Sequence, residues 1–275
     1  MATVAGTLVE QEPRPDYLSG TPRANAVDRW IYVFTAASFV AIVLAGFIPD
    51  SLMKIELVRS GQRPPFPVVL HMHAALMGTF LLLLMTQTAL AATDRLDVHR
   101  RLGIAGMVLA PLLVIVGTVL IPTTYHTLWD AAQATPAGAK RDDLLFSVKV
   151  WENIMLLQIW IGIGFALFIT LALKARGASA GLHKRMMILA VAMPLPAGID
   201  RIPWLPKTLP ASPLSAELYV LLAIAPMFLW DVYRNRSVHR AYWIWLGVNV
   251  PVAVVVNSVW DTPAWHSAAK WLMGV

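Results

Sequence analysis

The chain has 275 residues, of which 57% are hydrophobic and only 14% are charged. Soluble domains carry about a quarter charged residues, so this composition is typical of an integral membrane protein. The formal net charge of +6 comes from cations beside apolar segments, which suits an anionic leaflet and does not indicate nucleic-acid binding. The chain has no cysteine, which excludes disulfides, thiolate metal sites and cysteine nucleophiles.

Seven apolar segments separated by polar breaks predict an all-α, multi-pass bundle of about seven transmembrane helices. The chain is expected to divide into a polar cytoplasmic tail (1–28), a membrane domain (29–260) and a periplasmic C-terminal tail (261–275). The predicted spans, in chain order, are 30–47, 68–92, 104–121, 150–173, 186–202, 214–233 and 243–256.

Lysine and arginine concentrate in the N-terminal tail and in the short breaks after the even-numbered spans. The positive-inside rule therefore predicts a cytoplasmic N-terminus and a periplasmic C-terminus in a bacterial inner membrane. The longer outer connections, 122–149 and 203–213, are expected to cap the outer face, and the second is rich in proline. Pro194 and Pro196 interrupt the fifth span, so that helix is expected to kink.

The histidines divide into two layers along the predicted bundle. His71 and His73 lie near the outer end, whereas His99, His183 and His239 begin spans or precede them near the cytoplasmic end. At 100° per residue, the first two point some 200° apart on one helix, so they cannot both bind one ion on a regular helix. We expect His71 to point inward.

Glu152, Asp200 and Arg201 are ionisable groups expected at the same depth as the outer histidines. Such groups inside a bilayer are costly, and they mark functional sites when they lie in the hydrocarbon. One hypothesis is a pocket in which Glu152, His71 and Arg201 face one another. In that pocket His71, His73 and Glu152 could bind a metal, and Asp200 and Arg201 could bind a substrate. The alternative is that these residues lie just outside the hydrocarbon, in water.

In the inner layer, two breaks share the pattern of a histidine followed by two cations, at His99 and at His183. One interpretation is that these groups bind lipid head groups. The other is that the two imidazoles turn inward and ligate one haem iron, with Arg100, Arg101, Lys184 or Arg185 available for the propionates.

The segments HMHAALMGTFLLLLMTQTAL, HRRLG and HKRMM resemble a group of uncharacterised bacterial polytopic membrane proteins of the DUF2306-like type, over about residues 68–200. More distantly, histidines in two layers of a helical bundle resemble cytochrome b561-type haem proteins. That resemblance implies haem ligation by His71, His73, His99 or His183. Both outer candidates lie on one helix, which departs from the paired axial histidines of that family and favours one haem or one metal.

We therefore expect an inner-membrane protein that binds a haem or metal ion for electron transfer or oxidation, with a quinone or another membrane redox protein as partner. The alternative is a cofactor-free small-molecule transporter or a respiratory-complex assembly factor. A retinal protein is disfavoured because Lys270 lies beyond the seventh span. No Walker, GxSxG or HExxH motif is present.

Overall fold

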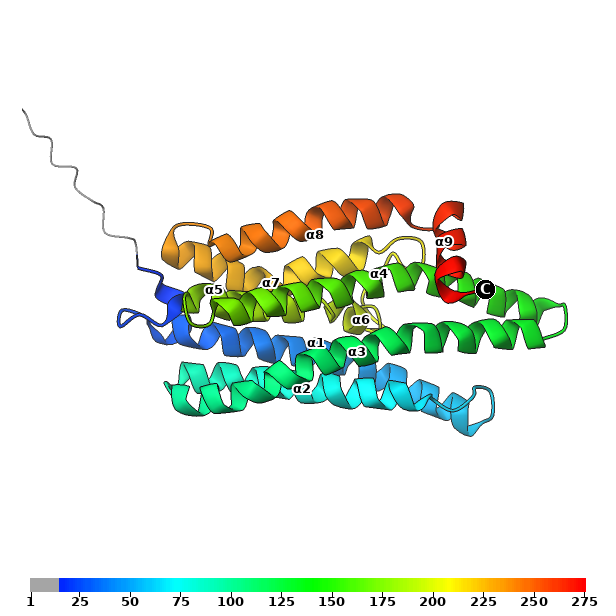
Figure 1. The fold of residues 1–275 in the computed structure, drawn as a ribbon, viewed down its shortest axis with the longest axis horizontal. Coiled ribbons are helices and arrows are strands. Elements are labelled where there is room, and N and C mark those ends of the chain that lie inside the picture. Colours follow the sequence, from blue (N-terminus) through cyan, green and yellow to red (C-terminus); the bar gives the residue numbers. More distant parts are fainter. Residues whose placement is uncertain (1–14) are drawn as a thin grey trace, which may run out of the picture.

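A computed structural model describes residues 15–275, in which helix is the only regular secondary structure and no strand occurs (Figure 1). The helices in chain order are η1 (Tyr17–Ser19), α1 (Ala26–Arg59), α2 (Val68–Ala92), α3 (Leu96–Ala134), α4 (Ala139–Ala175), α5 (Ala180–Ala192), α6 (Leu195–Ile199), α7 (Leu214–Asn235), α8 (Arg240–Val259) and α9 (Pro263–Met273). The all-α prediction is confirmed.

Among the described residues, six helices are long and apolar enough to cross a membrane: α1, α2, α3, α4, α7 and α8. Large apolar side chains on these helices point away from the bundle. Leu82, Leu222 and Val254, for example, are each more than 60% exposed. A surface of this kind is suited to lipid, where the helical backbone satisfies its own hydrogen bonds. The chain is therefore a multi-pass membrane protein.

The long helices lie side by side along one axis, which gives the bundle two distinct ends (Figure 1). The turns α2–α3, α4–α5 and α7–α8 gather at the end that also holds η1, which we call the η1 end. The connections α1–α2 and α3–α4 and the short helix α9 lie toward the opposite end, the α9 end. His99, His183 and His239 belong to the η1 end, whereas His71 and His73 lie in the first turns of α2 and belong to the α9 end.

The predicted fifth span is two helices, as its prolines indicated. Helix α5 ends at Ala192 and α6 begins at Leu195, with a turn at Met193 and Pro194 between them. Pro194 and Pro196 lack an N–H, so two backbone hydrogen bonds are lost within one turn, and the helix breaks there. The two pieces have 13 and 5 residues, and neither is long enough to cross a bilayer alone.

Most of the expected outer connection 122–149 is helical in the structure. Helix α3 continues to Ala134 and α4 begins at Ala139, with Gly138 at a φ of 147° in the turn between them. Pro122 lies inside α3, where it leaves the carbonyl of Thr118 without its usual backbone donor, and the helix nevertheless continues to Ala134. In contrast, 203–213 contains no helix, as predicted.

Helix α5 lies at the centre of the fold, where it contacts α1, α4, α7 and α8. Its residues Ile188, Leu189 and Ala190 are almost completely buried. The closest backbone approach joins α1 to α6, since a Cβ atom on Gly46 would lie 2.0 Å from the carbonyl oxygen of Gly198. The two glycines therefore allow α6 to pack directly against α1.

The two regions expected to be tails are ordered where the structure describes them. Leu18 of η1 is 1% exposed and belongs to the core, so residues 15–25 fold back under the η1 end. Residues 261–275 contain α9, which begins after a Thr262 cap and packs against α4. The remainder of the predicted N-terminal tail, residues 1–14, lies outside the described residues.

Candidate functional site

His99 and His183 occupy equivalent positions in two neighbouring helical hairpins. His99 lies in the first turn of α3 and His183 in the first turn of α5. Their ring centroids are 6.4 Å apart, and the ring planes are nearly perpendicular at 86°. The structure thus brings together the two inner histidines that the sequence pattern singled out.

Each of these imidazoles is held by its Nδ1 atom on a backbone carbonyl of the preceding helix. Nδ1 of His99 lies 3.2 Å from the carbonyl oxygen of Gln87, and Nδ1 of His183 lies 2.8 Å from that of Ala172. The Gln87 amide also donates to the carbonyl of His99 at 3.1 Å. A carbonyl accepts only from an N–H, so both rings carry a proton on Nδ1, and the neutral form of each ring offers the Nε2 lone pair to a ligand.

The cations next to these histidines have different environments. Arg100 and Arg101 are exposed at the η1 end, and no hydrogen bond of theirs is found within residues 15–275. Lys184 donates to the carbonyl of Ser19 at 3.1 Å. Arg185 is completely buried and bonded to the carboxylates of Asp16 and Asp231, so its guanidinium does not face a propionate in this structure, contrary to the expectation.

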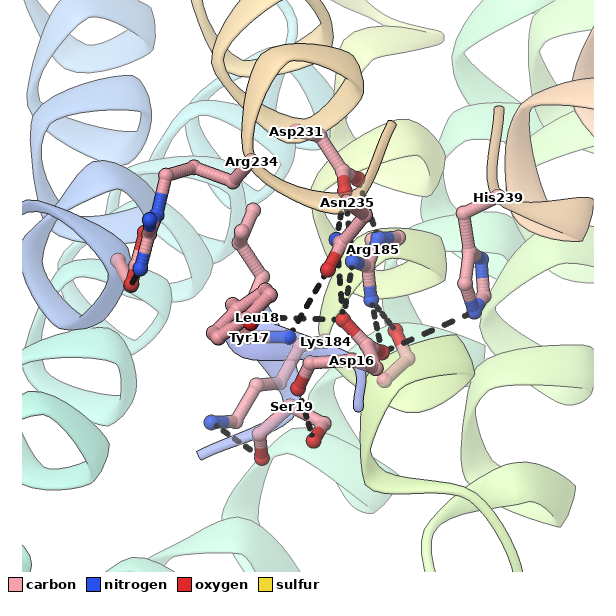
Figure 2. A network of polar contacts seen from close by, with 12 residues as sticks. Asp16, Tyr17, Leu18, Ser19, Lys184, Arg185, Asp231, Arg234, Asn235 and His239 are labelled. Carbon is pink, nitrogen blue, oxygen red and sulfur yellow. Dashed lines mark hydrogen bonds and ion pairs between the residues drawn. The ribbon is translucent and has the colours of Figure 1, made fainter. Parts of the chain in front are cut away.

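A second cluster surrounds that buried arginine (Figure 2). Arg185 of α5 forms a fork with Asp231 of α7 through Nε and Nη2, and a second fork with Asp16, which precedes η1. Asp231 is also fully buried and accepts hydrogen bonds from the Tyr242 hydroxyl at 2.9 Å and the Asn235 amide at 2.7 Å. The cluster joins the N-terminal segment, α5, α7 and α8.

Charge and burial act in opposite directions on Asp16. Burial alone would raise the pKa of its carboxyl group, but the hydrogen bonds and positive charge of Arg185 prevail and lower it. His239, the N-cap of α8, lies with Nε2 4.0 Å from Asp16. Burial, followed by the charge of Arg185, lowers the pKa of His239 to about 4, so this imidazole is neutral at pH 7.

The proposed outer metal set is not assembled. His71 is exposed, with Nδ1 3.2 Å from the carbonyl oxygen of Pro67. His73 is half-buried on the side of α2 that faces Gly117 of α3, and its Nδ1 has no hydrogen-bond partner among the described residues. Glu152 has different partners, and residues 15–275 contain no group of three or more His, Asp or Glu side chains able to hold a metal.

Glu152 instead belongs to a hydrogen-bonded chain at the α9 end. Its carboxylate lies 2.6 Å from Nδ1 of His266 and accepts from the Tyr125 hydroxyl at 3.2 Å. Nε2 of His266 lies 3.0 Å from Asp261, which Lys149 contacts at 3.1 Å. Hydrogen bonds from Lys149 and His266 lower the pKa of Asp261. These bonds fasten α9 to the side of α4 and, through Tyr125, to α3.

Asp200 and Arg201 line a cavity of about 340 Å³ at the α9 side of α6. Arg201 pairs with Asp50 at 3.3 Å and stacks over the Phe47 ring. Within residues 15–275 it forms no hydrogen bond or ion pair with Glu152 or His71. The side chains of Glu152, His71 and Arg201 therefore do not contact one another as the pocket hypothesis expected. The cavity is lined by Pro49, Asp50, Met53, Lys54, Asp200, Arg201, Pro203 and Lys207.

Sequence reasoning did not identify Asp16, Asp231 or His266 as members of sites. Each meets its partner from a distant part of the chain: Asp16 is 169 positions from Arg185, and His266 is 114 positions from Glu152. A charged residue near a span end, such as Asp231, was the one available signal.

Comparison of the chain with protein-family models, curated proteins and solved structures finds no match in any of the three.

Proposed function

We propose that this chain is an electron-transfer protein of the bacterial inner membrane that binds one haem between His99 and His183. The observation that carries the proposal is the pair of imidazoles, each fixed through Nδ1 and each with Nε2 available, at the start of two neighbouring helices. The resemblance of the histidine pattern to cytochrome b561-type proteins supports the same assignment.

The spacing of the pair fits an ion held between two nitrogens. Metal–imidazole bonds are about 2 Å long, which places the centroids of two opposed rings roughly 6 Å apart. The observed separation is 6.4 Å. Two neutral imidazoles are a donor set suited to haem iron, and the exposed Arg100 and Arg101 are close in sequence to His99 and could neutralise propionates. A haem bound there would supply reversible one-electron transfer.

The residues of the chain have defined tasks in this proposal. The carbonyls of Gln87 and Ala172 fix the tautomer and orientation of the two rings, as outer-shell acceptors do for metal-bound histidines generally. The α2–α3 and α4–α5 hairpins set the distance between the rings. A membrane-soluble electron carrier, a quinone or another membrane redox protein, is the expected partner.

We further propose that α5 and α6 together form one broken crossing, which gives seven crossings with the η1 end in the cytoplasm and the α9 end in the periplasm. Cations near the α2–α3 and α4–α5 turns support this orientation, among them Arg95, Arg100, Arg101, Lys174 and Arg176. Helix breaks are tolerated at membrane depth when the surrounding protein buries them, and Leu195 and Ile199 of α6 are buried.

A small-molecule transporter remains a second candidate because of the cavity beside α6. Asp200, Arg201, Lys54 and Lys207 line about 340 Å³ of space at the C-terminal end of α6, the short helix that follows the break. Broken helices that border polar cavities are the usual construction of transporter binding sites.

Absorption spectroscopy of the purified protein, together with metal analysis, separates these two functions. The wild-type protein from haem-replete cells should show a Soret band, and His99→Ala and His183→Ala should each lose it. His71→Ala is the matched control, because this exposed histidine lies at the other end of the bundle and should leave the band unchanged. A wild-type protein without a Soret band or stoichiometric metal would favour the transporter.

A further inference from the structure

The buried guanidinium of Arg185 has all five of its N–H groups in hydrogen bonds, and two of these bonds depend on a segment outside the helical bundle. The Nε–H group and one N–H of Nη2 donate to the Asp231 carboxylate, and one N–H of Nη1 donates to the Gly181 carbonyl at 3.0 Å. The remaining two reach the carboxylate of Asp16, at 2.9 Å from Nη1 and 2.8 Å from Nη2. Asp16 thus fills one complete face of the arginine fork.

The surroundings of the Asp16 carboxylate are those of an acid-binding pocket. His239 approaches it to 4.0 Å, and Lys184 holds the same segment through the Ser19 carbonyl (Figure 2). Gly181 leaves room for the carboxylate, since a Cβ atom there would lie 2.1 Å from Oδ2 of Asp16. The pocket therefore combines a planar fork of donors with a space the size of an oxygen atom.

The charges limit which acid fits this pocket. Asp231 neutralises Arg185 within the bundle, so the arginine fork is a donor pair with little excess positive charge. A ligand with one negative charge is balanced by the nearby Lys184. A ligand with two negative charges would be repelled by the buried carboxylate of Asp231. The two parallel N–H groups also match the two oxygens of a carboxylate.

We propose that Arg185, Gly181 and His239 form a binding site for a small monocarboxylate, and that Asp16 is a built-in occupant that such a ligand replaces. The Asp16 side chain is 27% exposed, so the site opens toward the solvent at the η1 end. The proposal uses neither imidazole of the His99–His183 pair, and it holds whether or not the chain binds haem.

Asp16→Ala tests the site by chemical rescue. In detergent, this variant should unfold at a lower temperature than the wild type, because two buried N–H groups lose their acceptor. Sodium acetate should raise the unfolding temperature of the variant in a saturable manner, beyond the effect of sodium chloride at equal ionic strength. The wild type should show a weaker acetate response that needs more acetate, because Asp16 occupies the donors of Arg185 and competes with the added acid. A folded variant that responds equally to acetate and chloride would overturn the proposal.

Two further variants separate binding from general stabilisation. Asp16→Ala combined with Gly181→Ala should lose the acetate response, because the added methyl group occupies the space of a carboxylate oxygen. Asn235→Ala removes the acceptor for the Tyr17 amide and donors to Asp231 and Asp16, but it leaves the Asp16 carboxylate in place on Arg185. It should therefore lower stability without creating an acetate response of the size seen in Asp16→Ala. An acetate response of equal size in Asn235→Ala or in the double variant would contradict a specific site.

Inorganic phosphate tests the ligand class in Asp16→Ala. Acetate and formate should stabilise the variant more than phosphate at equal ionic strength, and the reverse order would refute the monocarboxylate assignment. If the variant does not fold without a ligand, its yield is measured after purification with acetate or with chloride. A higher yield in acetate supports the site, and equal recovery in both salts overturns it.

Discussion

Arg185 and Asp231 form an ion pair that is completely removed from solvent. Both side chains are 0% exposed, and Nη2 of the arginine donates to Oδ1 of the aspartate at 2.8 Å in addition to the Nε bond. The pair links α5, the central helix, to α7. Because burial of ions is costly, such a pair persists only when nearly every donor and acceptor is satisfied. Here Tyr242 and Asn235 donate the additional hydrogen bonds to Asp231.

Arg185→Gln should destabilise the protein strongly. The substitution leaves the Asp231 carboxylate buried without its cation, and breaking a buried pair in this way costs about 3–5 kcal/mol. Arg29→Gln is the control, because Arg29 pairs with Asp94 at an exposed site where an ion pair contributes at most about 1 kcal/mol. Denaturant titration in detergent micelles measures both. Equal, small losses in the two variants would contradict the structural role of the cluster.

Most of the helical architecture follows from the sequence, because hydrophobic runs of membrane length leave few alternatives. All six long apolar helices lie where spans were predicted, and Pro194 and Pro196 correctly located the break between α5 and α6. The helix ends were less predictable. Residues 122–134 extend α3 well past the predicted third span, because Pro122 removes one backbone hydrogen bond without ending the helix.

The sites were only partly predictable, because they depend on contacts between distant segments. The repeated pattern of a histidine with two cations identified His99 and His183, which do lie together. The same pattern assigned Arg185 to the cofactor or to lipid, although its partners are Asp16 and Asp231. No local periodicity indicates that an N-terminal segment folds back onto α5.

Acid should destabilise the protein through His239. Its pKa is lowered from 6.5 to about 4 in the folded state, so between these values the unfolded chain binds a proton that the folded protein does not. The free energy of unfolding therefore decreases as the pH falls from 6.5 toward 4. The groups that face His239 are Arg185, Asp16, Asp231 and Arg240.

His239→Asn tests this contribution, because asparagine retains an N-cap acceptor for the Ala241 amide but does not titrate. The variant should lose less stability than the wild type between pH 6.5 and 4, as measured by unfolding in detergent. Asp16 also has a lowered pKa, and its contribution is lost only as the pH falls below the usual value of 3.8. Identical pH profiles for the variant and the wild type would exclude the role of His239.

Gly46→Ala should disturb the packing of α1 against α6. The added methyl group would meet the Gly198 carbonyl at 2.0 Å, so the helices must separate at a cost of about 1–3 kcal/mol. Gly162→Ala is the matched helical control, since nothing lies within 4 Å of its added carbon. That variant should be neutral or slightly more stable. Thermal unfolding of the two proteins compares them, and a neutral Gly46→Ala would show that the close contact is not required.

Reporter fusions should place the two ends of the bundle on opposite sides of the membrane. A reporter after Gly177, in the α4–α5 turn, is expected in the cytoplasm, and one at the C-terminus in the periplasm. Paired alkaline phosphatase and fluorescent-protein fusions distinguish the compartments. If both positions report the same side, then α5 and α6 do not complete a crossing and the orientation proposed here is incorrect.

The electron paramagnetic resonance spectrum of the oxidised, purified protein tests the proposed haem ligation most directly. Two axial imidazoles with planes at 86° should give a highly anisotropic low-spin signal, with about one haem per chain. His99→Ala and His183→Ala should each abolish that signal, whereas His71→Ala should retain it. Wild-type protein that contains no haem, or a low-spin signal that survives both substitutions, would contradict ligation by His99 and His183.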